Sequence, residues 1–259
     1  MMGQFMNFYA LLLWLLGPLL EALILARGIQ TGWFTKYRAF SAYVGCVLIQ
    51  DVLFMGVYFL RFNDYGWIYW WGELFSVALG VGVTWGIFGL ILGPYPGANR
   101  MARNVLTVVI VMTFSANLAD AWRGQLLSSG TVIELERNLR VMQAVSLLVL
   151  AALAAYYKIP IGRNAKGMFA GYGIFIGTSV ITLTLRSSLG ESFQRAWVSA
   201  QPLCYILTLL IWSAFLWKYE PVTAVDVRPR IEKNYRLLAL ITRKRVLQAR
   251  AFLGKATRP

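Results

Sequence analysis

The polar side chains best suited to chemistry lie at helical spacings inside long apolar runs of the sequence. An isolated charge is costly in hydrocarbon, so acids, arginines and amides in such runs tend to face one another or a bound ligand. Residues three or four apart share one face of a helix, and Glu136, Arg140 and Gln143 have this spacing. The candidates for ligand binding or for a polar network are Asp51, Glu73, Asn117, Asp120, Glu136, Arg137, Arg140, Gln143, Thr182, Arg186 and Arg195.

The residue types that are missing narrow the chemistry further. Histidine is absent, which excludes His-ligated haem, His–metal sites and Ser–His or Cys–His nucleophile pairs. Cys46 and Cys204 both lie in apolar runs and are expected to be buried free thiols. Every lysine falls at a predicted helix end or in the C-terminal tail, so none is placed for a retinal Schiff base. We therefore predict a protein that is not an enzyme and has no metal site; the sequence identifies no cofactor.

Membrane-spanning helices must position these residues. Hydrophobic residues make up 58% of the 259 residues and charged residues 14%, against about 25% charged in a soluble domain. A bilayer core about 30 Å thick requires about twenty helical residues. We predict an all-α polytopic protein with a seven-helix transmembrane domain at 1–218, a basic tail at 219–259, and a retained first helix. The predicted spans are 6–26, 38–60, 67–92, 103–122, 134–157, 167–186 and 194–217.

Lysine and arginine set the predicted orientation. Every second connector and the C-terminal tail are basic, whereas no basic residue precedes Arg27. Positively charged segments stay in the cytoplasm, so we expect the N-terminus outside and the C-terminus inside. The expected location is the bacterial inner (cytoplasmic) membrane. Much of the net charge of +14 then determines topology, and we expect no nucleic-acid partner.

Depth along the predicted spans divides the polar residues unevenly. Most of the candidates fall in the outer half, where six helices could direct them toward one outward-opening volume. Two interpretations stay open: hydrogen bonds and ion pairs that fix helix register, or a water-accessible site for an ion or small polar ligand. Glu21 stands apart near the inner end of the first span. It would pair with a cation such as Arg103 or reach the headgroups; the alternative is a proton or cation pathway.

Glycine and proline indicate how closely the helices approach one another. Gly82 and Gly86, Gly167 and Gly171, and Gly173 and Gly177 have the four-residue spacing of close helix contacts. Pro202 in the seventh span would free a backbone carbonyl and could kink that helix. These positions predict where the backbones approach or bend.

The tail after residue 220 is basic and amphipathic. Arg236, Arg243 and Arg250 recur every seven residues, with Lys244 beside them. Such a helix would lie on the cytoplasmic leaflet and bind anionic lipid headgroups, at about 1 kcal/mol per cation. Docking to a membrane or cytoplasmic protein partner is the alternative.

The layout resembles uncharacterised bacterial seven-helix integral membrane proteins and the seven-helix sensory regions of bacterial signalling proteins. The sequence WWGE at 70–73, which opens the third span, and LERN at 135–138, which opens the fifth, carry the resemblance. It covers about residues 6–218 and implies a sensor-like module without a fused output domain. It transfers no binding residues.

Three functions remain open. The preferred one is a receptor-like or regulatory module that binds a small ligand or partner in its outer-half polar pocket. The second is an accessory or structural subunit of a larger membrane complex, because every visible feature can serve packing and anchoring. The third is a small-solute or ion transporter, against which the apolar inner half counts.

Overall fold

The computed structural model describes residues 8–60, 65–122 and 129–220, together with Leu237, Leu240, Ile241, Lys244 and Gln248. The described chain is all-α, as predicted. Its elements are α1 (Phe8–Thr31), α2 (Arg38–Leu60), α3 (Tyr65–Leu92), α4 (Pro96–Trp122), α5 (Ser129–Tyr156) and α6 (Arg163–Leu216). The five described tail residues are also helical.

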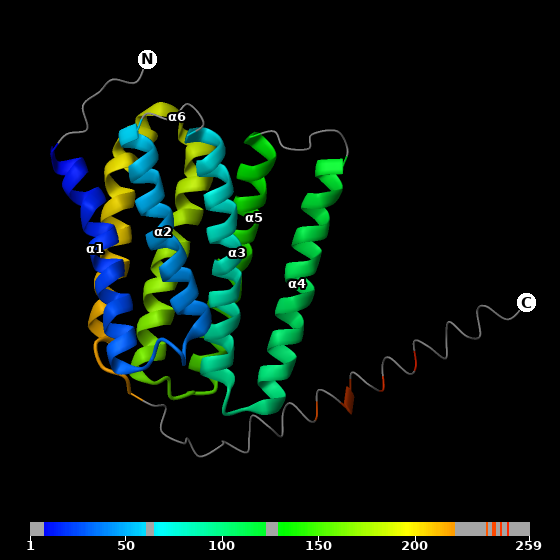
Figure 1. Ribbon diagram of the computed structural model, residues 1–259. Coiled ribbons are helices and arrows are strands. Elements are labelled where there is room, and N and C mark those ends of the chain that lie inside the picture. The colour runs from blue at the N-terminus through cyan, green and yellow to red at the C-terminus, as the bar shows by residue number, and fades with distance from the viewer. Residues whose placement is uncertain are drawn as a thin grey trace, which may run out of the picture.

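The long element α6 turns back on itself. A straight helix of its 54 residues would be about 80 Å long at 1.5 Å per residue. Nevertheless Arg163 Nη2 donates to Ala214 O at 3.3 Å, and Asn164 Nδ2 donates to Lys218 O at 3.0 Å. The two ends of α6 therefore lie side by side, and the element forms two antiparallel legs (Figure 1).

The helices stand side by side in one bundle with α4 at its edge (Figure 1). α1 packs against α2 and α6, α3 against α2, α5 and α6, and α4 against α3 and α5. The core between them is aromatic: the edge of Phe40 meets Trp212 with ring centroids 4.9 Å apart, and Tyr43 meets Tyr172 at 5.8 Å. This large ring volume holds α2 against both legs of α6.

The outer surface of the bundle is apolar. Leu19, Met112 and Leu148 are about two-thirds exposed, and many other large apolar side chains share this exposure. Three described segments are long and apolar enough to cross a membrane, Arg38–Val57, Leu74–Leu92 and Leu135–Tyr156. Pro202–Leu216 is a shorter apolar helix. This combination of length and surface is that of a membrane-associated protein.

One end of the bundle gathers positive charge, and we call it the basic end. The connectors at 32–37, 93–95 and 157–162 and the segment 217–220 all lie there (Figure 1). Cations flank or occupy each of these segments. They are Arg27, Lys36, Arg38, Arg100, Arg103, Lys158, Arg163, Lys166 and Lys218.

An indole closes the basic end between α1, α2 and α6. Trp33 is fully buried, and its Nε1 donates to Leu216 O at 3.1 Å. A Cβ on Gly28 would lie 2.9 Å from the Trp33 ring, so glycine is needed there for this approach. Burial, and then the neighbouring Tyr219, raise the pKa of Tyr37 in the same connector to about 12. Trp33 thus fixes the connector to the end of α6. Tyr37 stays protonated at neutral pH.

The glycine pairs divide into close and open positions. A Cβ on Gly167 would overlap Phe215, and one on Gly171 would overlap the Trp212 indole, so this pair makes the close contact that its spacing predicts. The same expectation is wrong for Gly173, Gly177 and Gly82, which have nothing within 4 Å of an added Cβ. Gly86 meets only Ala39, at an ordinary 3.5 Å. Close approach is therefore confined, among these pairs, to the interface between the two legs of α6.

Gly171→Ala should destabilise the protein by about 1–3 kcal/mol, because the buried Trp212 indole has no free space in which to move. Gly173→Ala on the same helix is the matched control, with open space around the added methyl group. Thermal unfolding in detergent, followed by circular dichroism, measures both. Equal melting temperatures for the two variants would contradict the close contact.

Candidate functional site

A chain of buried hydrogen bonds joins α5 to α6. Arg140 Nε donates to Glu136 Oε1 at 2.8 Å, and both side chains are about nine-tenths buried. Arg140 Nη1 donates to Ser179 Oγ at 3.2 Å, and Arg140 Cζ lies 5.4 Å from the centre of the Phe175 ring. Ser179 in turn donates to Phe175 O at 2.9 Å. The guanidinium is therefore held by an acid, a hydroxyl group and an aromatic face.

A second group of buried hydrogen bonds, one turn further along α5, joins α6 and α5 to α3. Tyr172 OH donates to Gln143 Oε1 at 3.2 Å, and Gln143 Nε2 donates to Val77 O at 3.3 Å. Gln143 and Tyr172 are fully buried. A Cβ on Gly80 would overlap Tyr172 OH. Glycine at this position therefore lets the backbone of α3 pack against the Tyr172 hydroxyl group. We call Glu136, Arg140, Gln143, Tyr172 and Ser179 the α5 network.

Glu21 belongs to a different group of side chains. It is fully buried on α1, and Tyr205 OH on α6 donates to its Oε1. Asp51 on α2 lies beside this pair: Asp51 Oδ2 and Tyr205 Cε1 are each 3.7 Å from the position of a Cβ on Gly17. We call Glu21, Asp51 and Tyr205 the Glu21 cluster.

The expected pairing of Glu21 with Arg103 is wrong. The Arg103 guanidinium lies over the Trp85 ring, 4.3 Å from its centre. Arg103 is on α4 at the edge of the bundle, whereas Glu21 is on α1, which packs against α2 and α6 (Figure 1). Because α1 continues to Thr31, Glu21 also lies about 15 Å from the end of its helix.

The other predicted candidates are only partly described. Thr182 is half-buried and donates to Thr178 O at 2.7 Å on its own helix, and Arg137 is half-buried on α5. Lys244 in the tail is exposed. The side chains of Glu73, Asn117, Asp120, Arg186, Arg195, Arg236, Arg243 and Arg250 lie outside the described residues.

The described candidates fall into two groups. Glu136, Arg140 and Gln143 lie on one face of α5, whereas Asp51 lies with Glu21. Over the described ranges 38–60 and 129–156, the backbones of α2 and α5 are not direct neighbours. The side chains of the α5 network are also too buried, and too well supplied with mutual hydrogen bonds, to leave an open cleft among themselves.

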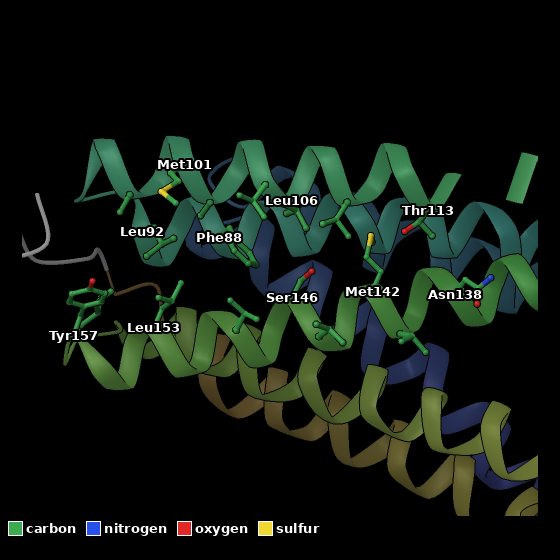
Figure 2. A pocket seen from close by; sticks show the side chains of 18 of the residues that line it. Phe88, Leu92, Met101, Leu106, Thr113, Asn138, Met142, Ser146, Leu153 and Tyr157 are labelled. Atoms are coloured by element: carbon green, nitrogen blue, oxygen red, sulfur yellow. The ribbon is translucent and has the colours of Figure 1, made fainter. Parts of the chain in front are cut away.

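An apolar groove of about 780 Å³ lies on the other side of α5, between α4 and α5. Phe88 and Leu92 of α3 form its floor (Figure 2). Along α4 it runs from Ala98 to Ala116, which is about 27 Å at 1.5 Å per residue. We call this cavity the α4–α5 groove.

Polar groups in the groove lie mainly at its two ends. Thr113 and Asn138 are at the end away from the connectors, and Tyr157 is at the basic end, as Figure 2 shows. Ser146 is the polar group in the middle section, and the neighbouring lining includes Met142. The wall is therefore apolar along most of its length.

Sequence reasoning missed this groove because it followed charge. A usable signal was present on α4, where small and β-branched residues recur every three or four positions along one face. These side chains leave a gap that larger residues would have filled toward α5. They are Ala98, Ala102, Val105, Val109 and Thr113.

The described part of the chain offers few groups that could bind a metal. No group of three or more acidic or cysteine residues there could hold a metal ion. Comparison of the chain with protein-family models, with curated proteins and with solved structures gives no match. The functional argument therefore depends on the two polar groups and the groove.

Arg140→Met should lower the free energy of unfolding by about 3–5 kcal/mol, because Glu136 would be left buried without its cation. The double variant Glu136→Leu/Arg140→Met removes both charges and should recover part of this loss. Chemical unfolding in mild detergent measures the three proteins. A double variant no more stable than the single one would show that the pair is not a unit.

Proposed function

We propose that this protein is a non-catalytic integral membrane protein of the receptor-like or regulatory kind, which binds an elongated amphiphile in the α4–α5 groove. The observation that carries the proposal is the groove itself, with its volume of about 780 Å³ and its apolar wall. Cavities of about 300–1,000 Å³ with a few polar groups are typical of ligand sites. Glu136, Arg140 and Gln143 of the α5 network do not line this groove.

The shape of the groove favours an amphiphile with a long chain. Its length of about 27 Å approaches the hydrocarbon thickness of a bilayer, about 30 Å. Thr113 and Asn138 lie at one end and Tyr157 at the other, where a polar head would bind, while the middle section is apolar apart from Ser146 and would contact the chain. Met101 and Met142 add adaptable thioether side chains, which suit a flexible ligand.

The proposed topology has seven spans, with the N-terminus outside and the basic end in the cytoplasm of a bacterium. Support comes from the two antiparallel legs of α6, which count as two spans, and from the nine cations at the basic end. The tail would continue from that end as a basic amphipathic helix on anionic lipid headgroups. In support, Leu237, Leu240, Ile241, Lys244 and Gln248 are each helical and exposed.

Val109→Trp should prevent ligand binding in the groove. Val109 lines the groove, and an indole there would occupy the space of the ligand's acyl chain. Val108→Trp is the matched control: Val108 is exposed on the same helix and does not line the groove. Lipid extracts of the purified proteins, analysed by mass spectrometry, and displacement of a fluorescent fatty-acyl probe give the readout. We expect at least a tenfold loss of probe affinity for Val109→Trp alone.

Two outcomes would contradict the proposed ligand. Equal probe binding by the two tryptophan variants would show that the groove is not the site. Stoichiometric co-purification of a second membrane protein with the wild type, lost in Val109→Trp, would replace the amphiphile with a partner helix and favour an accessory subunit. Melting temperatures of both variants are needed to show that each is folded.

Cysteine labelling tests the topology. With Cys46 and Cys204 replaced by alanine, Gln248→Cys in the tail should react with a membrane-impermeant maleimide only after the cells are opened. Gln125→Cys, between α4 and α5, should react in intact cells. The reverse pattern would invert the proposed orientation.

A further inference from the structure

The Glu21 cluster lies about halfway along the length of the helices. Counted from the basic end, Glu21 is ten residues inside α1, Asp51 thirteen inside α2, and Tyr205 eleven inside α6. At 1.5 Å per residue these depths are about 15, 20 and 17 Å. Three helices thus bring two carboxyl groups and a phenol to one level, far from both ends.

The hydrogen bonding of Glu21 is incomplete. Tyr205 OH donates to Oε1, but Oε2 is buried and has no hydrogen-bond partner within the protein. Buried polar atoms without protein partners are rare in folded proteins, and a bound ion or water often satisfies them. The side chain is fully buried, and the nearest acid is Asp51. Glu21 therefore presents an unused oxygen inside an acidic cluster.

Among the described residues, the cluster has no cation as a partner. No ion pair among the described residues joins Glu21 or Asp51 to Lys or Arg. Arg27, the nearest cation along α1, instead donates to Trp217 O and Gln30 Oε1. The titratable groups around Glu21 on the neighbouring helices are Asp51 and Tyr43 on α2 and Tyr205 on α6. A fully buried carboxylate with a second, half-buried carboxylate nearby is stabilised by a positive charge.

Two prolines interrupt the backbone hydrogen bonding of α1 and α6 near the cluster. Pro18 lies three residues before Glu21 in α1, and Pro202 lies three residues before Tyr205 in α6. Because proline has no N–H, the backbone carbonyl groups four residues earlier, at positions 14 and 198, lose their helical partners. α1 and α6 pack against each other. Each of these carbonyl groups lies seven residues, about 10 Å of helix, from Glu21 or Tyr205, on the side away from the basic end, and is therefore not a ligand of the cluster.

We propose that Glu21, Asp51 and Tyr205 form a binding site for one small monovalent cation, a proton or a sodium ion. The ligands would be Glu21 Oε2 and an oxygen of Asp51, with Tyr205 OH fixing the Glu21 carboxyl group. The site lies on α1, α2 and α6, away from the α4–α5 groove, and goes beyond the proposed function.

The test uses purified full-length protein and its melting temperature. One titration replaces choline chloride with sodium chloride at constant ionic strength and pH; the other lowers the pH without sodium. We expect the wild type to gain several degrees in one of them, since a ligand that binds only the folded state stabilises it. A gain with sodium identifies the metal ion, and a gain on acidification alone identifies the proton.

Variants assign the effect to the cluster. Glu21→Gln and Asp51→Asn should flatten the responsive titration, whereas Glu220→Gln should retain it. Glu220 is the control because it is a half-exposed acid at the basic end, paired with Arg163 at 3.1 Å. If Glu21→Gln and Asp51→Asn do not fold, Tyr205→Phe should weaken the response, because it removes only the hydroxyl group that orients Glu21.

Two results would overturn the site. One is a wild-type melting temperature that changes with neither sodium nor pH. The other is a response that persists unchanged in the folded variants among Glu21→Gln, Asp51→Asn and Tyr205→Phe. Loss of probe binding in the α4–α5 groove would not bear on this site, because the two share no residues.

Discussion

The structure depends on one constraint: the outside of the bundle is apolar, so polar groups find their partners inside it. Leu148 and Met112 face outward, as suits a membrane-associated protein. Arg140 is instead enclosed by Glu136, Ser179 and Phe175. The same pressure keeps Gln143 between Tyr172 and a carbonyl of α3. The polar side chains therefore pair inside the bundle, and the apolar side chains cover its outer surface.

Close packing between the two legs of α6 fixes where these partners meet. Gly167 and Gly171 let Phe215 and Trp212 approach the first leg, and Trp212 also supports Phe40 on α2. This arrangement sets the depth of Tyr205 on the second leg and so its contact with Glu21. α4 lies outside this tightly packed part, and its small side chains leave the groove beside α5. The bundle therefore has a dense half around α6 and an open edge at α4.

The two candidate sites use different physics. The α4–α5 groove selects by shape and apolar area, with polar groups at its ends. The Glu21 cluster selects by charge, since a fully buried carboxyl group and a half-buried one lie together without a cation among the described residues. The α5 network resembles the cluster in composition but contains its own arginine. A buried acid that is already paired stabilises structure, whereas one that is not creates a demand for a ligand.

The sequence by itself determined the helical class, the apolar surface and the shared face of Glu136, Arg140 and Gln143, because these follow from composition and the 3.6-residue period. It also placed Gly167 and Gly171 correctly at a close contact. Only the tertiary structure decided that Gly173 and Gly177 are open, that Asp51 lies with Glu21, and that a groove follows α4. Periodicity gives the face on which a residue lies, but the partner of that face depends on which helix packs there and on where each helix ends.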